Sequence, residues 1–349
     1  MKHPSLGWDI GTAYDLFVSM KAIHQPLTYG LRGSWAAGVR SRLPMELRET
    51  LELVSMALRI PLHWLHTLPK PKNAATVLTH LEKIPPSDRL IRLAFPPHIQ
   101  SEYRDILINT NPKRKWSAVE VKALRNSLRT SYRISAADYL DTLRKIWTRQ
   151  EQIGQMLYPA LKAFFDGFFI EEEARIIPSL QVGLAHAQAR SGSLQIPALL
   201  EELSLGVRFG DFLNIPELVL APSFWGSPFV FYDYVDSKTN MLLFGSRPDD
   251  CALIPGDIIP ESLLRGLKAL ADPTRLRILR NLADGPLTPT QLARSLRLRT
   301  PTVTHHLLAL RLAGLIQVII SSLGERRYAT RVEGLGSTQE TLEKFVNGE

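Results

Sequence analysis

Residues 267–316 read LKALADPTRLRILRNLADGPLTPTQLARSLRLRTPTVTHHLLALRLAGLI. Three polar residues in this stretch are each followed by a proline, in the pairs Asp272-Pro273, Thr288-Pro289 and Thr300-Pro301. A side-chain oxygen just before a helix accepts a free backbone N–H, and a proline in the first helical position loses no hydrogen bond there. The stretch therefore predicts three short helices with sharply defined starts.

The ends of these helices and the two faces of the third are also encoded locally. Gly285 and Gly314 follow the first and third helices, where glycine readily adopts the left-handed conformation that ends a helix. Gln291, three residues after Thr288, predicts a capping box. The third helix places on one face Val303, His306, Leu307 and Leu310, and on the other Pro301, Thr304, His305 and Leu308. We expect the first face to lie in the core, with His306 making a structural hydrogen bond, and the second to be free.

A two-stranded hairpin follows the third helix. Residues 315–331, LIQVIISSLGERRYATR, alternate between apolar and polar types around Gly324. Such alternation is typical of paired strands and places Arg326 and Arg327 near the tip of the hairpin. Helix, turn, helix and hairpin together predict a winged helix-turn-helix.

These residues resemble the ArsR family of winged-helix transcriptional regulators over about 258–346. The residues that carry the resemblance are the Ala-Asp-Pro-Thr-Arg helix start at 271–275, the T-V-T-H-H-L motif at 302–307 and the A-G-L-I motif at 313–316. The resemblance implies a homodimer that binds operator DNA, in most members as a repressor released by a ligand. It also implies that the helices at 261–271 and 337–346 form the dimer interface.

The third helix and the hairpin supply the candidate DNA contacts. An α-helix fits the major groove, where hydroxyls and an imidazole meet base edges, and arginines of a wing meet phosphates or a narrow minor groove. The expected base-reading residues are Thr300, Thr302, Thr304 and His305. The expected phosphate and wing contacts are Arg299, Arg311, Arg326, Arg327 and Tyr328. The alternative for this set is an ordinary solvated basic face.

The charge distribution favours a polyanionic partner for the C-terminal part. The chain has 349 residues and a net charge of +8. Residues 260–349 contain 13 Lys and Arg against 8 Asp and Glu, and no acidic residue lies between Asp284 and Glu325. A basic surface of this kind suits the phosphates of double-stranded DNA. We expect DNA with an inverted-repeat operator as the partner.

Metal sensing is not expected. The resemblance places two cysteines of classical metal sensors at the positions of Thr288 and Thr290, and the terminal helix offers Glu340 and Glu343 without a histidine. Cys251 is the single cysteine, and soft cations need several thiolate ligands. We therefore predict no metal site, no cofactor, and DNA binding that is indifferent to zinc, cadmium and arsenite.

The fold class expected for the whole chain is mainly α with small β elements. Residues 1–250 are predicted as a helical N-terminal domain closed by a short β-sheet, with strands in the Val-, Phe- and Tyr-rich segment 218–244. The proline-rich segment 246–260 is the predicted boundary, and residues 258–349 are the winged-helix domain. The predicted N-terminal helices are 9–24, 45–59, 73–83, 86–95, 98–110, 117–130, 135–165 and 169–190.

Several N-terminal side chains have a functional and a structural interpretation. His63 and His66 have the spacing of two metal ligands on one helix, but packing against Trp64 is the favoured alternative. The run 171–173 of three glutamates is interpreted as ordinary capping at a helix start. Six aromatic residues either line a ligand pocket or form the core of the small sheet, and the core is favoured: Phe224, Trp225, Phe229, Phe231, Tyr232 and Tyr234.

The sequence thus predicts a homodimeric DNA-binding transcription regulator, a repressor whose N-terminal domain senses a non-metal signal. The effector, a small molecule or a protein, and its site are unknown from sequence, and no catalytic residues are assigned. Two alternatives stay open: an enzyme, or a protein-interaction module, with an appended autoregulatory DNA-binding domain. The longest uncharged stretch, 218–232, is shorter than the roughly 18 to 20 residues of a membrane span, and no secretory signal is seen. We expect a cytoplasmic protein without a membrane partner.

Overall fold

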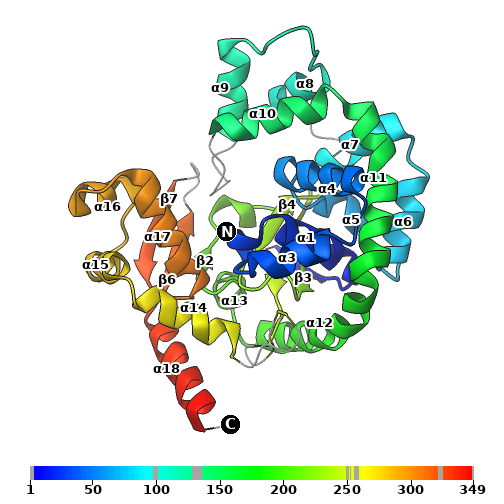
Figure 1. The fold of residues 1–349 in the computed structure, drawn as a ribbon. Helices are drawn as coiled ribbons and strands as arrows, with labels where there is room; N and C mark the ends of the chain where they lie inside the picture. Colours follow the sequence, from blue (N-terminus) through cyan, green and yellow to red (C-terminus); the bar gives the residue numbers. More distant parts are fainter. Residues whose placement is uncertain are drawn as a thin grey trace.

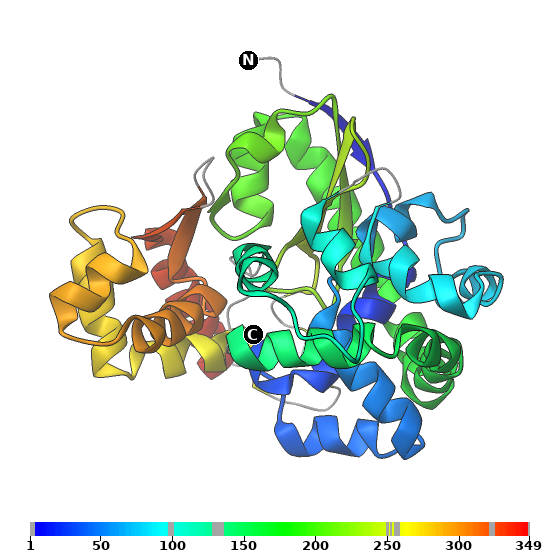
Figure 2. The same ribbon diagram turned by 90° about the horizontal axis from the view of Figure 1, so that it is seen from above.

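The computed structural model describes residues 4–96, 101–127, 136–248, 251, 253–254, 259–320 and 325–347. Both views show two regions side by side (Figures 1 and 2). The larger N-terminal region spans residues 4–248, and the smaller C-terminal region spans residues 259–347. The described residues are mostly helical with small sheets, as the pattern of residues along the chain predicted. None of their helices is long and apolar enough to cross a membrane.

A sheet with the strand order β1-β3-β5-β4 runs through the N-terminal region, and helices lie on both sides of it (Figure 2). Its strands are β1 (Ser5–Trp8), β3 (Glu217–Ser223), β4 (Phe231–Tyr234) and β5 (Thr239–Gly245). Strands β1, β3 and β5 are parallel, and β4 is antiparallel to β5. Strands β3 and β5 are buried along nearly their whole length because both sheet faces are covered. The sequence predicted strands within 218–244, but it did not predict β1.

The N-terminal helices surround this sheet. They are α1 (Thr12–His24), α2 (Pro26–Tyr29), α3 (Gly33–Arg40), α4 (Met45–Ala57), α5 (Leu62–Thr67), α6 (Ala74–Glu82), α7 (Pro86–Ala94), α8 (Glu102–Ile108), α9 (Ala118–Ser127), α10 (Ala136–Trp147), α11 (Gln150–Phe164), α12 (Ile170–Ser191) and α13 (Ile196–Leu203), with a π-helical turn η2 (Phe165–Phe169) and a 3₁₀ turn η3 (Asp211–Leu213). The predicted helix 135–165 is divided into α10 and α11. Parts of the predicted helices 98–110 and 117–130 lie outside the described residues.

The C-terminal region has the predicted order of helices and strands. Its elements are α14 (Glu261–Leu270), α15 (Pro273–Leu282), α16 (Pro289–Leu296), α17 (Thr300–Leu312), β6 (Ile316–Ile320), β7 (Arg326–Thr330) and α18 (Val332–Asn347). Their core contains Ile278, Leu292, Val303, Leu307, Leu310 and Ile316. Strands β6 and β7 pair as an antiparallel hairpin. The predicted tip around Gly324 lies outside the described residues.

Two of the three predicted helix caps are present. The Asp272 side chain accepts hydrogen bonds from the backbone N–H groups of Thr274 and Arg275. Thr288 and Gln291 form the predicted capping box. The third prediction was wrong, because α17 begins one residue earlier than expected: Arg299 is its N-cap residue and makes no side-chain cap. Thr300 therefore lies in the first helical turn.

The two regions share a second sheet. Strand β2 (Val207–Arg208) comes from the N-terminal region and pairs in parallel with β6, which gives the strand order β2-β6-β7. The Val318 N–H also donates to the Gly206 carbonyl over 3.0 Å. The wing of the C-terminal region is therefore hydrogen-bonded to the N-terminal region. Within the predicted boundary 246–260, residues 249–250, 252 and 255–258 lie outside the described residues.

Candidate nucleic-acid interface

The N-terminal half of α17 is exposed to solvent. Thr300, Thr302 and His305 are exposed, and Arg299 is exposed at the N-cap. Thr302 and His305 are three residues apart, so they lie on one face of the helix. Thr304 is half-buried, and its hydroxyl donates to the Thr300 carbonyl over 2.9 Å. The structure thus groups these five predicted contacts at one end of a helix that is anchored by its core face.

His306 packs against the start of α15. Its side chain is 14% exposed, and its Nδ1 atom lies 3.9 Å from Oδ2 of Asp272. Burial lowers the pKa of the His306 imidazole, although the Asp272 carboxylate acts in the opposite direction. His306 therefore lies beside the N-cap of α15 and outside the exposed set, but its Nδ1 atom has no hydrogen-bond partner among the described residues, so the expected structural hydrogen bond is not seen there.

The C-terminal half of α17 faces the N-terminal region. Leu308, expected on the free face, is only 6% exposed. It lines a groove of about 110 Å³ together with Val207 and Phe229 of the N-terminal region. The Nη2 atom of Arg311 donates to the Ser204 carbonyl over 2.6 Å. Nη2 of Arg311 is thus directed toward the N-terminal region, and this geometry does not favour the expected phosphate contact.

The described part of the wing presents one clearly exposed arginine. Arg327 is exposed, and its Nε atom pairs with Glu325 Oε2 at 3.2 Å. Arg326 is half-buried at the start of β7. Tyr328 is 2% exposed and belongs to the core, and its backbone bridges to Leu287. Tyr328 is therefore unsuited to DNA contact, and its assignment to the wing surface is corrected.

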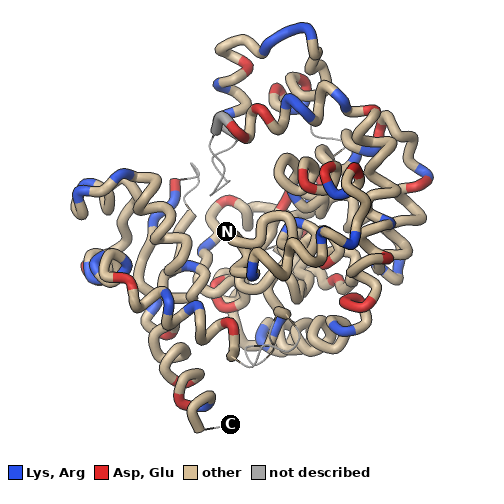
Figure 3. Tube along the Cα trace, viewed as in Figure 1, with Lys and Arg blue, Asp and Glu red and all other residues tan. Residues whose placement is uncertain are grey.

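Further arginines adjoin α17 that the sequence reasoning did not select. Arg294 in α16 and Arg297 at its C-cap are both exposed. Figure 3 shows basic positions along α15 and α16 with few acidic positions among them. The signal was present in the sequence, since Arg294, Arg297 and Arg299 place three arginines within the six residues before α17. Such a cluster attracts the phosphate backbone next to a helix that reads the groove.

The N-terminal histidines have acidic neighbours from distant parts of the chain. Nδ1 of His63 lies 4.0 Å from Asp233 Oδ2, and Nδ1 of His66 lies 3.9 Å from Asp9 Oδ2. Within the described ranges, no group of three or more His, Cys, Asp or Glu side chains is arranged to hold a metal ion. The two histidines therefore belong to separate contacts with the sheet and its neighbours.

The glutamate run 171–173 differs from its interpretation as capping, because η2 continues into α12 and leaves no free helix start there. Glu172 is buried, accepts from the Trp225 indole N–H over 3.2 Å and pairs with Arg175 at 2.6 Å. Glu173 accepts from the backbone N–H of Ala74 over 2.8 Å. These carboxylates join α12 to other elements of the N-terminal region.

The aromatic residues of 224–234 are divided between two environments. Phe224 and Trp225 are at most 1% exposed and lie in the main core. Phe229 and Tyr232 line the groove beside Leu308. The predicted core role thus holds for Phe224 and Trp225. Phe229, Phe231 and Tyr232 are partly buried and also pack against cores of the N-terminal region, whereas Tyr234 is 50% exposed.

A helix-turn-helix whose second helix exposes polar residues, followed by a hairpin, defines a winged-helix DNA-binding protein. Residues 272–318 match the family model described as "Bacterial regulatory protein, arsR family". The chain is 40% identical over 82 residues to the HTH-type transcriptional regulator Rv2034 of Mycobacterium tuberculosis. The aligned stretch covers 23% of this chain and 75% of Rv2034. The chain belongs to the ArsR family.

A second relative matches over a shorter length. The chain is 53% identical over 57 residues to the HTH-type transcriptional regulator CmtR of Mycobacterium bovis. The aligned stretch covers 16% of this chain and 48% of CmtR. The chain thus spans about half the length of CmtR. No solved structure matches the chain. The family model lies wholly in the C-terminal region, so the N-terminal region must be interpreted from its own structure.

Proposed function

We propose that the chain is a sequence-specific DNA-binding transcription regulator that acts in the cytoplasm as a homodimeric repressor. The observation that carries this proposal is the exposed end of α17, where Thr302 and His305 share one face beside a cluster of arginines. Hydroxyl and imidazole groups on a helix read base edges in the major groove, and the arginines hold the phosphates on either side.

Dimerisation is supported by apolar surface on α18. This helix packs against α14 and exposes Leu335 and Phe345 at 38% each and Val346 at 72%. Leu267 of α14 is also exposed, at 39%. Apolar side chains on two adjacent helices favour burial against a second copy, since each buried residue removes its surface from water. A two-fold dimer then presents two α17 helices to successive major grooves.

The N-terminal region is proposed as the sensor of a non-metal signal. It is hydrogen-bonded to the wing through β2 and to α17 through Ser204, so a change in its position acts on both DNA-binding elements. Thr288 and Thr290 stand where the family's metal sensors have thiols, which is why a non-metal signal is proposed.

The test is selection of bound sequences from a random duplex pool by the full-length protein, followed by footprinting. We expect an inverted repeat whose half-sites lie about one helical turn apart, because the two recognition helices of a dimer reach the same DNA face. A single asymmetric half-site, or binding without sequence preference, contradicts the proposal.

A further inference from the structure

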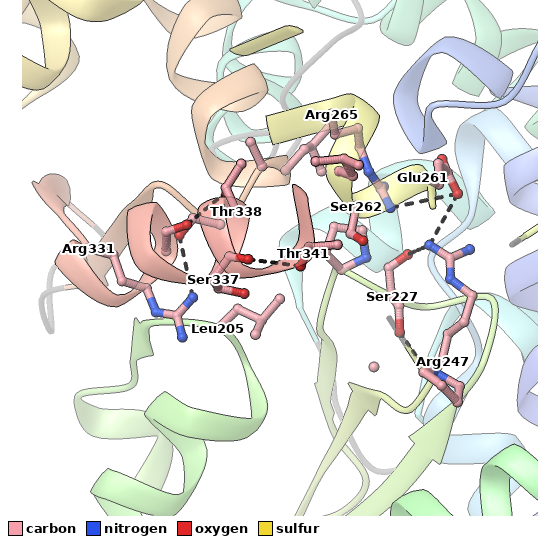
Figure 4. A pocket seen from close by; sticks show the side chains of 18 of the residues that line it. Leu205, Ser227, Arg247, Glu261, Ser262, Arg265, Arg331, Ser337, Thr338 and Thr341 are labelled. Carbon is pink, nitrogen blue, oxygen red and sulfur yellow. Dashed lines mark hydrogen bonds and ion pairs between the residues drawn. The ribbon is translucent and has the colours of Figure 1, made fainter. Parts of the chain in front are cut away.

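A cavity of about 480 Å³ lies between the two regions. Figure 4 shows side chains from three segments pointing into it. The N-terminal region contributes Ser227 and Arg247, the helix α14 contributes Glu261 and Arg265, and the chain from β7 to α18 contributes Arg331 and Thr338. Ligand sites have volumes of roughly 300 to 1,000 Å³, so this cavity is large enough for a small metabolite.

Arg247 is the most deeply buried charge of the cavity. It follows β5, so it lies beyond the carboxyl end of a parallel strand, which is where ligands bind in open parallel sheets. Its side chain is 4% exposed, and Nη2 lies 3.3 Å from Oε2 of Glu261. Its Nη1 atom is buried and has no hydrogen-bond partner among the described residues. Burial lowers the pKa of Arg247 to about 10, and Arg265 acts in the same direction.

The acidic side chains of the cavity do not balance its arginines. Oε2 of Glu261 is shared by Arg247 and by Arg265, whose Nη2 lies 3.7 Å away. Glu202, the other carboxylate of the lining, is already held by two hydrogen bonds of 2.6 and 2.7 Å from Arg190. Arg331 adds a further guanidinium. Among the residues that the structure describes, the lining therefore has three arginines against two glutamates, an excess of positive charge that an anionic group would neutralise.

The remaining polar side chains that line the cavity are His186, Cys251 and a set of hydroxyls. The hydroxyls belong to Ser227, Ser262, Ser337, Thr338 and Thr341. The Thr338 and Thr341 hydroxyls donate to backbone carbonyls of α18 over 2.9 and 2.8 Å, which leaves their oxygen lone pairs available as acceptors. Arginines beside several hydroxyls suit a ligand that has an anionic group at one end and hydroxyl groups at the other.

We propose that this cavity binds a small polyhydroxylated organic anion, whose phosphate or carboxylate meets Arg247 and Arg265 and whose hydroxyls meet α18. This inference deepens the proposed function, since α14 and α18 are also the proposed dimer helices. A ligand held by Arg247 on one side and by α14 and α18 on the other fixes the position of the N-terminal region relative to the dimer. Binding thereby changes the separation of the two α17 helices and the affinity for DNA.

The direct test is calorimetric titration of the full-length protein with three probes of similar size: glucose 6-phosphate, gluconate and glucose. We expect at least one of the two anions to bind with a millimolar or lower Kd, and glucose to bind at least tenfold more weakly. The anion that binds distinguishes a phosphate from a carboxylate ligand. Failure of both anions to bind at 20 mM, or equal binding of glucose, overturns the proposal.

Substitutions of cavity residues test whether the anion binds in the cavity. Arg265→Met, which keeps Arg247 and its buried contacts, is expected to weaken anion binding at least tenfold. The matched control is Arg125→Met, because Arg125 is exposed on α9 and does not line the cavity. A thermal unfolding scan checks that each variant is folded. Thr338→Val tests the hydroxyl end and is expected to weaken binding severalfold. If Arg265→Met and Arg125→Met bind the anion equally, the cavity is not its site.

The proposed effect of the anion on DNA binding is tested separately, by measuring DNA affinity with and without the anion. We expect a change of at least fivefold, a typical size for coupling between two sites. If the anion binds but DNA affinity is unchanged, the proposed regulation of DNA binding is overturned, while the proposed anion site stands. Loss of sequence-specific DNA binding under all conditions overturns the proposed function instead, and the calorimetric result stands independently of it.

Discussion

The Nη2 atom of Arg311 donates a hydrogen bond to the backbone carbonyl of Ser204 over a distance of 2.6 Å. This contact joins the C-terminal half of α17 to the end of α13, more than a hundred positions earlier in the chain. It divides the basic residues near the recognition helix into two groups. Arg299 and Arg327 are exposed and available to DNA, whereas Arg311 connects the two regions.

Arg311→Met is expected to lower the free energy of unfolding by about 1 to 3 kcal/mol, because a hydrogen bond from a charged donor to a largely buried carbonyl is lost. Chemical denaturation of the full chain measures this change. The salt dependence of DNA binding is expected to stay as in the unchanged protein. A shallower salt slope in Arg311→Met would restore its assignment as a phosphate contact.

Arg327→Met is expected to weaken binding to all DNA sequences alike and to reduce the salt slope by about one unit, because one phosphate contact is removed. Mobility-shift titrations at several salt concentrations give the slope. The free energy of unfolding is expected to change by less than about 0.5 kcal/mol, as is usual for an exposed side chain. A loss confined to one DNA sequence would contradict this role.

His305→Ala is expected to reduce discrimination at one base position by about 1 to 3 kcal/mol, because the imidazole is exposed on the face of α17 that we propose enters the major groove. Affinities for the preferred operator and for its single-base variants give this value. Binding to non-specific DNA is expected to stay unchanged. Equal weakening on every sequence would place His305 among the phosphate contacts.

Tyr328→Ala is expected to destabilise the protein by about 3 to 5 kcal/mol, since a large side chain is removed from the core beneath the wing. Tyr328→Phe keeps the ring and serves as the milder variant if the alanine form does not fold. Neither variant is expected to change the salt slope of DNA binding once it is folded. A marginal loss of stability in Tyr328→Ala would contradict the core role.

Asp15 predicts a pH dependence of stability in the N-terminal region. The Asp15 carboxylate accepts from the Ser223 hydroxyl and the Trp225 backbone N–H, and its burial raises its pKa to about 6. Between about pH 4 and 6 the unfolded chain loses this proton and the folded chain keeps it, so stability falls as pH rises through that window. Across this window the free energy of unfolding falls by on the order of 3 kcal/mol.

Asp15→Asn has no proton to lose at this position. The free energy of unfolding of the unchanged protein, minus that of Asp15→Asn, is therefore expected to decrease from pH 4 to pH 7. Urea denaturation at several pH values measures the difference. A difference that is constant across the range, or that grows with pH, would contradict the direction of the shift.

The C-terminal fold was predictable because its signals are local. The caps at Asp272 and Thr288 and the turn at Gly314 each depend on residues within a few positions of one another. The alternation of the strand also indicates that Tyr328 is buried. Neighbouring residues of a strand point to opposite faces, and Arg327 is exposed. This alternation was sufficient to predict that Tyr328 does not lie on the exposed face of the wing.

The contacts between the regions had no local signal. The burial of Leu308 and the direction of Arg311 depend on residues 204–207 and on Phe229, which lie about 80 to 100 positions away. The parallel strand β1 was missed for the same reason, because four residues at the start of the chain acquire their partner from β3. Tertiary pairing of this kind overrides what a short window of sequence can indicate.

The pairing of β2 with β6 bears on how the DNA-binding part behaves when it is cut from the rest of the chain. A fragment that begins at residue 258 lacks Val207 and Arg208, so the backbone N–H and C=O groups of β6 on that side lose their partners. An open edge that carries Val318 and Ile320 is a template for strand addition by another molecule. We therefore expect such a fragment to self-associate through the open edge of its wing, and pairing with β2 to prevent this strand addition in the full chain.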